Sequence, residues 1–386
     1  MQQVVFSSRT ELKRHTDMIS GPWVEVDLDA IAHNYRQIQN ICNVPLMPVI
    51  KGNAYGHGHI EVGRFLEKIG AHSLCVGYLR EAVALREAGI TCPILNLGPF
   101  SPKEAETIIT QNISQSVFTD HVDHLDQTAG RLGKVARVHI KIDTGLGRVG
   151  VPYDSAQDYI RHVAGLSKIR IEGVFTTLTE DQSFDHEQLR RFNTIVESAA
   201  DQSIDLGLRH AASSAAILEY PESHLDLVRP GITIFGHYPS TKEFRKRRIE
   251  LKPALSLKAR VSCVKILKKG DAVAYHRIYR AEEDQLMITG AIGYPDGYPS
   301  HIANKAQCII RGRPYPLVAT VTANNIYIQG NVDAEVAVGD EILLMGGGRN
   351  GPVSVESLAE ISELSEYKLL AGLNPLLHRF YYSTQL

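Results

Sequence analysis

Residues 46–59 read LMPVIKGNAYGHGH, a short apolar run that ends at Lys51 and continues into a segment of glycines, histidines and Tyr55. An apolar run of this length, bounded by turn-forming residues, is typical of a buried strand. The lysine then stands where that strand ends. Whether this position belongs to a functional site depends on what the rest of the chain builds around it.

The segments that follow repeat one pattern, because strand-like and helix-like stretches alternate up to about Tyr238. The candidate strands cover residues 46–50, 73–78, 92–98, 114–119, 138–143, 171–177, 206–211 and 227–236. Eight such units predict an α/β fold, the (β/α)8 TIM barrel. A doubly wound open sheet is the alternative, because the sequence alone does not show that the sheet closes.

Several of the intervening segments carry helix signals. Residues 60–70 and 186–200 are amphipathic, with apolar side chains near one helical face. Another helix is expected to start at Ser101, with Pro102 in its first position and Glu104 completing a capping box.

The pattern changes after about Leu251. Residues 254–267 alternate between apolar and polar side chains, and short strand-like stretches follow at 326–331, 335–347 and 352–358. This pattern, with glycine and aspartate in the turns, predicts a β-rich C-terminal domain. The last long stretch, residues 358–373, is expected to be helical.

Three parts of the chain are therefore expected: an N-terminal arm at 1–22, a barrel domain at 23–250 and a C-terminal β domain at 251–386. The strand-like residues 23–28 precede a helical stretch and lie outside the barrel count. We expect this strand to pair with the C-terminal domain. The arm is expected to be mobile.

Composition excludes several classes of protein. The chain has 386 residues, 44% of them apolar and 22% charged, as in ordinary globular proteins. A net charge of −2 gives no electrostatic signal for nucleic acid or an anionic membrane, and no apolar run reaches transmembrane length. The first twenty residues lack the apolar core of a signal peptide, and the five scattered cysteines favour reduced thiols, so we expect a cytoplasmic protein.

Three basic residues fall at the ends of candidate barrel strands: Lys51, Arg148 and Arg229. The active site of such a barrel lies at the C-terminal ends of its strands. The loops after the last two strands, residues 211–217 and 229–233, have the serines and glycine that suit a phosphate group. A lysine amine facing a phosphate site indicates a Schiff base to a phosphorylated aldehyde. Taken singly, a solvated lysine and a helix start explain these residues equally well.

Five motifs together resemble one family. PVIKGNAYGHG (48–58) closely resembles the cofactor-lysine motif of alanine racemases, and HIKIDTGLGRVGV (139–151), HAASSAA (210–216), LVRPGITIFG (227–236) and GYPDGY (293–298) follow in the family's order and spacing. The resemblance runs from about Trp23 to near the C-terminus. It implies a barrel that binds pyridoxal 5'-phosphate (PLP), a β domain after it, and an isomerase that interconverts L- and D-alanine.

The resemblance also implies which residues hold the cofactor. Lys51 would carry PLP, and Arg229, supported by His210, would hydrogen-bond the pyridine nitrogen. The phosphate would be held by Tyr55, Ser214, Gly231 and Ile232. Because an arginine does not accept a proton, the nitrogen would stay neutral, which limits side reactions.

Racemisation removes a proton from one face of Cα and returns one to the other, which two bases achieve most simply. The resemblance implies that these are Lys51 and Tyr294, with Tyr294 donated by the partner subunit of a homodimer. Arg148 would contact the carboxylate of a small amino-acid substrate. Lys141 occupies a position that is often carbamylated, and an unmodified lysine beside Arg148 is the alternative.

Several positions depart from the family pattern, and they cluster around the substrate side chain. Thr177 stands in place of a histidine, while Ala323 and Asn324 replace a methionine and an aspartate. Residues 374–379 lack the family's second gate tyrosine. These changes enlarge the pocket and add polar groups, so we expect serine or a larger amino acid to be accepted beside alanine. One methylene discriminates by only about 1–3 kcal/mol.

Two other functions share parts of this pattern. A barrel-type PLP decarboxylase would favour a carboxylate at the position of Arg229. A non-catalytic PLP-binding homologue would lack the β domain, and the retention of Lys51 and Tyr294 argues against a degenerate racemase. The GGGRNG stretch at 346–351 is expected to be a loop between two β-strands and not a dinucleotide site, because no helix is expected after it.

Overall fold

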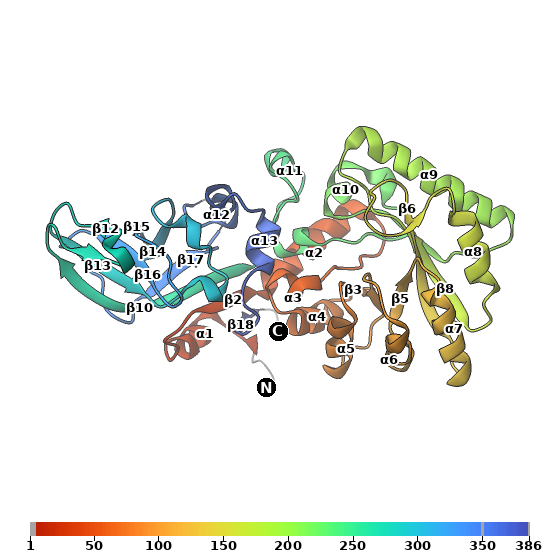
Figure 1. The fold of residues 1–386 in the computed structure, drawn as a ribbon, viewed down its shortest axis with the longest axis horizontal. Coiled ribbons are helices and arrows are strands. Elements are labelled where there is room, and N and C mark those ends of the chain that lie inside the picture. The colour runs from red at the N-terminus through yellow and green to blue at the C-terminus, as the bar shows by residue number, and fades with distance from the viewer. Residues whose placement is uncertain (1–4, 349–350, 385–386) are drawn as a thin grey trace.

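The computed structural model describes residues 5–348 and 351–384, which form a parallel-stranded barrel and a β domain (Figure 1). The chain enters the barrel through α2 (Leu28–Cys42). The two domains meet where α3 (Lys51–Tyr55) packs against α13 (Glu366–Ala371).

Six parallel strands make most of the barrel wall, in the order in which they occur along the chain. They are β3 (Leu74–Val76), β4 (Ile94–Asn96), β5 (Ser114–Val117), β6 (Ala136–Asp143), β8 (Ile169–Phe175) and β9 (Leu208–His210), with β7 (Val151–Pro152) added beside β6. All residues of β3 and β4 are buried, as expected for strands covered on both faces.

The ring closes through residues 46–50 and 227–230, which form isolated bridges and not the regular strands expected there. Leu46 pairs with Val228, and Val49 pairs with Cys75 on β3, both in parallel. Prolines at positions 45, 48 and 230 have no N–H to donate, so a continuous ladder cannot form. The predicted barrel is therefore confirmed, and the open sheet is wrong. Residues 232–235, expected as strand, form a 3-10 helix.

Helices and turns on the chain between these strands surround the barrel wall (Figure 1). They are α4 (His59–Lys68), α5 (Leu79–Glu87), η1 (Pro102–Glu104), α6 (Ala105–Thr110), α7 (His121–Arg131), α8 (Ala156–Gly165), α9 (Gln182–Asp201), α10 (Ser214–Glu219), η2 (Pro221–Ser223), η3 (Ile232–Phe235) and α11 (Thr241–Lys246). The predicted capping box is confirmed, because the backbone N–H of Ser101 donates to Glu104 Oε2 at 2.7 Å.

The β domain is built on a nine-stranded sheet in which β17 also returns to pair with β10. In sheet order the strands are β1 (Val5–Phe6), β18 (His378–Tyr382), β2 (Trp23–Asp27), β10 (Leu255–Leu267), β13 (Gln285–Gly290), β16 (Ile326–Gly330), β15 (Arg313–Val318), β14 (Gln307–Ile310) and β17 (Glu341–Met345). Smaller elements are β11 (Ala272–Val273), β12 (Tyr279–Arg280), η4 (Tyr275–Arg277), η5 (Tyr294–Asp296), η6 (Ser300–Ile302) and α12 (Val355–Ser362). Strand β2 pairs with β10 and β18, so residues 23–27 belong to this sheet and not to the barrel.

One part of the C-terminal expectation is wrong. Residues 355–358, expected as the end of a strand, begin helix α12 because the Ser354 side chain accepts the backbone N–H of Ser357 and caps it. The glycine stretch at 346–351 therefore leads from β17 toward a helix and is not a hairpin loop, and residues 349–350 lie outside the described part of the chain.

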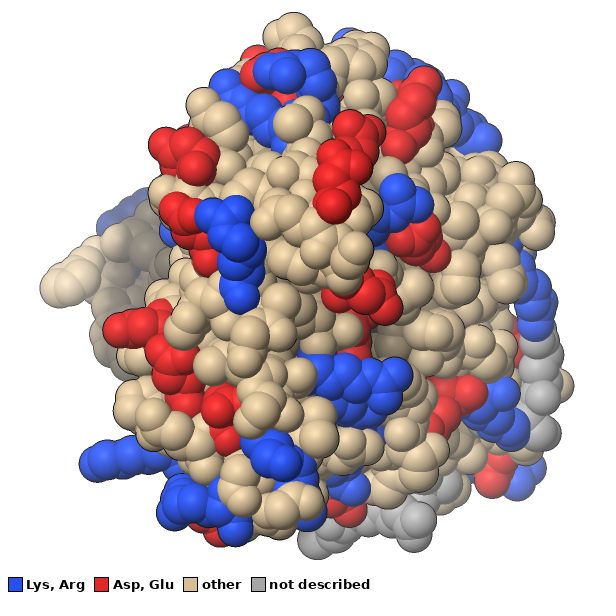
Figure 2. Space-filling view, turned by 90° about the vertical axis from the view of Figure 1, so that its right-hand side faces the viewer, with Lys and Arg blue, Asp and Glu red and all other residues tan. Residues whose placement is uncertain are grey.

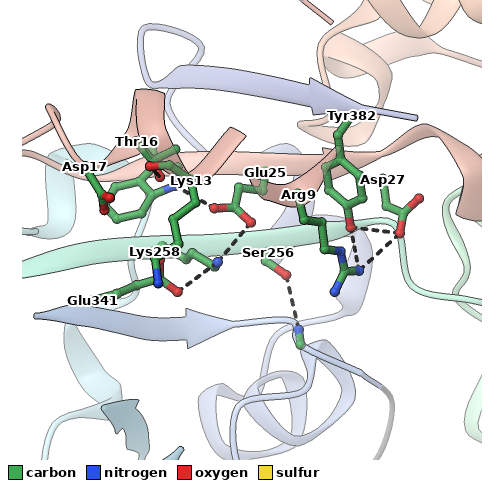
Figure 3. Close-up of polar contacts among 12 residues, drawn as sticks. Arg9, Lys13, Thr16, Asp17, Glu25, Asp27, Ser256, Lys258, Glu341 and Tyr382 are labelled. Atoms are coloured by element: carbon green, nitrogen blue, oxygen red, sulfur yellow. Dashed lines mark hydrogen bonds and ion pairs between the residues drawn. The ribbon is translucent and has the colours of Figure 1, made fainter. Parts of the chain in front are cut away.

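The N-terminal segment is packed, where a mobile arm was expected. Strand β1 pairs with β18, and α1 (Arg9–Thr16) follows with buried apolar side chains. Arg260 of β10 donates to the carbonyl of Thr16 at 2.8 Å and stacks over the Trp23 ring at 4.8 Å. Arg9 donates to the Tyr382 hydroxyl at 2.7 Å, a contact visible in Figure 3.

The outer face of the barrel carries both signs of charge. Figure 2 shows Lys and Arg side chains interspersed with Asp and Glu across this side of the molecule. Among the described residues, none of the helices combines the length and apolarity needed to cross a membrane.

Candidate active site

Lys51 begins a left-handed turn at the end of the first barrel segment. Residues 52–55 all have positive φ, between 50° and 62°, although three of the four are not glycine. Such residues each carry about 1–2 kcal/mol of strain, so the surroundings must hold the turn. Gly77 leaves the space beside it, because a Cβ there would lie 3.1 Å from Lys51 Cβ.

Glu81 supplies much of that hold. Its buried carboxylate accepts four backbone N–H groups: Oε1 binds those of Gly52 (2.8 Å) and Asn53 (3.3 Å), and Oε2 those of Gly77 (2.9 Å) and Tyr78 (3.1 Å). The carboxylate thus ties the lysine turn to the end of β3.

Groups from three segments converge on a small polar cradle. Gly231 N donates to Ser214 Oγ at 2.9 Å, and that hydroxyl lies 3.1 Å from Thr233 Oγ1. A Cβ at position 231 would lie 2.9 Å from the Tyr55 hydroxyl oxygen, so the glycine keeps the cradle open. Ile232 follows directly in η3, fully buried.

The Tyr55 ring is fixed between two aromatic rings. Its centroid lies 5.4 Å from that of Phe235 and 5.8 Å from that of Tyr367 on α13. Burial raises the pKa of Tyr55. The phenol is therefore neutral at physiological pH and serves as a hydrogen-bond donor.

Arg229 is buried and almost fully bonded. Its two terminal nitrogens donate to His210 Nδ1 (2.7 Å), to the His210 carbonyl (3.0 Å), and to the carbonyls of Thr176 (2.7 Å) and Ala211 (3.1 Å). A guanidinium has five N–H groups, so among the described residues the Nε–H alone is left without a partner.

Lys51, Lys141, Arg148 and Arg229 place four cations at one end of the barrel. Burial and then the charge of Arg148 lower the pKa of Lys51, and the same two causes lower the pKa of Lys141 to about 8. Arg148 itself is exposed, in a loop held by backbone N–H bonds to Asp143. Such a cluster suits a ligand with several negative charges.

Tyr294, Ala323 and Asn324 lie together on the β domain, away from this cluster. The backbone N–H of Tyr294 donates to the Thr322 carbonyl at 3.0 Å, next to the exposed Ala323 and Asn324. The Tyr294 side chain is 55% exposed, and none of the described contacts joins it to Lys51. The structure thus brings the barrel residues together and leaves these three on the surface of the β domain.

Sequence reasoning missed Glu81, Thr233 and Tyr367. The signal for Glu81 was available, because a glutamate in the first turn of a helix often accepts backbone N–H groups. Thr233 follows the predicted phosphate residues by one position. Tyr367 gave no local signal, since its contact with Tyr55 is made across the domain junction.

Comparison with known proteins agrees with this arrangement. Two family models match the chain, the alanine racemase N-terminal domain over residues 26–239 and the alanine racemase C-terminal domain over residues 254–381. An alanine racemase of Desulfovibrio desulfuricans is 40% identical over 332 residues, which cover 84% of this chain and 89% of that protein.

Solved structures are similar over nearly the whole chain. The alanine racemase of Clostridium difficile 630 has a TM-score of 0.89 at 30% identity, covering 95% of this chain and 97% of that one. A histidine racemase of Leuconostoc mesenteroides has a TM-score of 0.87 at 28% identity, covering 95% and 99%. On the strength of the two family models and these relatives, the chain belongs to the alanine racemase family.

Proposed function

We propose that this protein is a PLP-dependent amino-acid racemase that interconverts L- and D-alanine. The observation that carries the proposal is the juxtaposition, at one end of the barrel, of a lysine with a lowered pKa, an open polar cradle and a buried arginine with one uncommitted donor.

These residues fit PLP. The cradle of Tyr55, Ser214, Gly231 and Ile232 offers hydroxyl and backbone donors for a phosphate, in space that a Cβ would fill. The Nε–H of Arg229 is the donor available to a ring nitrogen. When bound, PLP supplies an electron sink that acidifies the substrate Cα–H.

Lys51 and Tyr294 are the proposed proton carriers, one for each face of Cα. A lowered pKa gives Lys51 a larger share of the neutral amine that can accept a proton. Tyr294 is exposed on its own subunit, and Leu376 beside it is 88% exposed. Exposed apolar and aromatic groups of this kind favour a surface covered by a second copy, so we propose a homodimer in which Tyr294 enters the partner's site.

Lys141 is proposed to be carbamylated. Carbon dioxide adds to a neutral amine, and a pKa of about 8 leaves a substantial neutral fraction at physiological pH. The product is an anion that would neutralise part of the charge of Arg148 and Arg229 and hold Arg148 toward a substrate carboxylate.

The substrate range is proposed to extend beyond alanine to serine or a larger amino acid. Ala323 and Asn324 are exposed beside Tyr294, so a small side chain and an amide border the place where that tyrosine acts. The similar fold of a histidine racemase shows that this architecture is compatible with a larger substrate.

The test is incubation of the PLP-loaded protein with L-alanine, L-serine and L-histidine in heavy water. Deuterium at Cα with formation of the D-isomer supports the racemase. Release of carbon dioxide supports a decarboxylase, and neither result supports a non-catalytic binding protein. Alanine turned over far faster than all other substrates would overturn the broad range while leaving the racemase intact.

A further inference from the structure

His139 is a buried histidine to which the proposed mechanism gives no role. It lies on β6, two residues before Lys141, and its Nδ1 is 2.9 Å from His210 Nε2. His210 in turn bonds Arg229 through Nδ1 at 2.7 Å. The two histidines and the arginine therefore form one chain that ends at the proposed ring-nitrogen contact.

The chemistry of this chain fixes every proton in it. A guanidinium only donates, so His210 Nδ1 must accept and the proton of the neutral ring sits on Nε2. That N–H then donates to Nδ1 of His139, whose own proton is on Nε2. Burial and the positive charge of Arg229 lower the pKa of both histidines, to about 3 for His139, so both rings are neutral.

Gly173 makes this contact geometrically feasible. It pairs with His139 in the β6–β8 register, and His210 lies one strand further on, at the end of β9. A Cβ at position 173 would lie 2.3 Å from His139 Nδ1. The imidazole of His139 therefore uses the space above a glycine to reach across β8.

Phe175 fixes the plane of the middle ring. It stacks on His210 with a centroid distance of 4.8 Å and an angle of 5° between the planes. The Arg229 guanidinium also lies 5.1 Å from the Phe175 centroid. His210 is thus held in plane by Phe175 and in tautomer by a partner at each nitrogen.

We propose that His139 is a positioning residue for Arg229 and acts through His210. By accepting the Nε2–H of His210, it stabilises the only neutral tautomer whose Nδ1 can accept from the guanidinium. It thereby holds Arg229 with its Nε–H free for the cofactor nitrogen. The catalytic part of this inference rests on the proposed function, whereas the tautomer part does not.

The tautomer is tested on the protein labelled with 15N-histidine, with and without PLP, using His139→Leu and His210→Asn to assign the signals. The expected result is a neutral ring protonated at Nε2 for both histidines. Protonation of His210 at Nδ1, or a charged ring at either position, overturns the proposal whether or not the protein is a racemase.

The positioning role is tested by comparing His139→Leu, which removes the acceptor, with His139→Asn, whose Oδ1 can take the place of Nδ1. For His139→Leu we expect kcat to fall about tenfold with KM changed less than about twofold, because no proposed substrate contact is altered. The 15N signal of ring-labelled PLP should move toward that of an unbonded pyridine nitrogen. His139→Asn should restore both values to near wild type.

Equal losses in the Leu and Asn variants, or an unchanged PLP nitrogen signal in His139→Leu, would overturn the positioning role. Circular dichroism checks that both variants fold. If His139→Leu does not fold, Gly173→Ala gives a second test, since its Cβ displaces the His139 ring while both histidines remain. A wild-type protein that racemises no amino acid would defeat the proposed function and leave the tautomer result standing.

Discussion

Charge at the active-site end of the barrel is controlled by burial of individual groups. Lys51 and Lys141 lie among cations in a partly enclosed space, and each cause lowers their pKa values. An anionic ligand in this space relieves repulsion that the protein has built up. The cradle residue Gly231 and the second lysine, Lys141, each allow a direct test of this arrangement.

The Gly231→Ala substitution is expected to weaken PLP binding by about tenfold or more, because the added Cβ would lie 2.9 Å from the Tyr55 hydroxyl, inside the cradle. Fluorescence titration with PLP measures the Kd. Gly165→Ala is the matched control, since a Cβ there meets no atom within 4 Å. Wild-type affinity in Gly231→Ala would mean that the phosphate binds elsewhere.

Lys141 should take up 13C-labelled carbon dioxide in a pH-dependent manner. The carbamate forms from the neutral amine, so at a fixed concentration of dissolved carbon dioxide its occupancy should rise with pH and reach half of its maximum near the pKa of about 8. 13C NMR of the protein measures the carbamate signal. Lys141→Arg should lack the signal, and a signal that persists in that variant would place the carbamate on another residue.

The site residues differ in how far the sequence reveals them. Tyr55, Ser214 and Gly231 lie in contiguous motifs whose spacing survives in the fold. His139 and Glu81 act through contacts between strands that are distant in sequence, and a single chain carries no local mark of them. The position of Tyr294 relative to Lys51 was also beyond local reasoning, because it depends on how two domains and two subunits are arranged.

At the scale of elements, the alternation of strands and helices predicted the barrel, and local chemistry decided the exceptions. Prolines prevent regular strands at residues 46–50 and 227–230 while the segments still close the ring. Near residue 355 the valines favoured a strand, but the capping hydroxyl of Ser354 started a helix. Apolar periodicity reports burial, and a single donor or acceptor can select the backbone conformation.

The link between β3 and the lysine turn should depend on Glu81. In Glu81→Gln the amide NH2 would face backbone N–H donors that a carboxylate oxygen now accepts. We expect a loss of about 2–4 kcal/mol in stability and a weaker visible absorbance of bound PLP. Thermal unfolding and the absorbance spectrum measure these effects.

Glu104→Gln is the control for that substitution, because Glu104 also accepts backbone N–H in a capping box but lies at the surface, away from the site. It should lose about 1 kcal/mol or less and keep the spectrum. Equal effects of the two substitutions would show that the Glu81 contacts have no special role at the lysine turn.

The N-terminal segment should detach when Arg260 is replaced. Arg260→Ala removes the bond to the Thr16 carbonyl and the stacking on Trp23. We expect trypsin to cleave after Arg9, Lys13 or Arg14 about tenfold faster than in wild type, because local opening exposes these sites. Mass spectrometry of the fragments measures the rate. Arg311→Ala, which loses an exposed ion pair with Asp340, should leave cleavage unchanged.

At the scale of the whole molecule, the separation of Tyr294 from Lys51 predicts complementation between two inactive variants. Lys51→Ala lacks the cofactor lysine, and Tyr294→Phe lacks the second proton carrier. If the tyrosine crosses to the partner, a mixed dimer contains one site with both residues and one site with neither. Random mixing makes half of the dimers mixed, so the refolded mixture should reach about a quarter of wild-type activity. A mixture that stays inactive while mass spectrometry shows mixed dimers would place both residues in the site of a single chain.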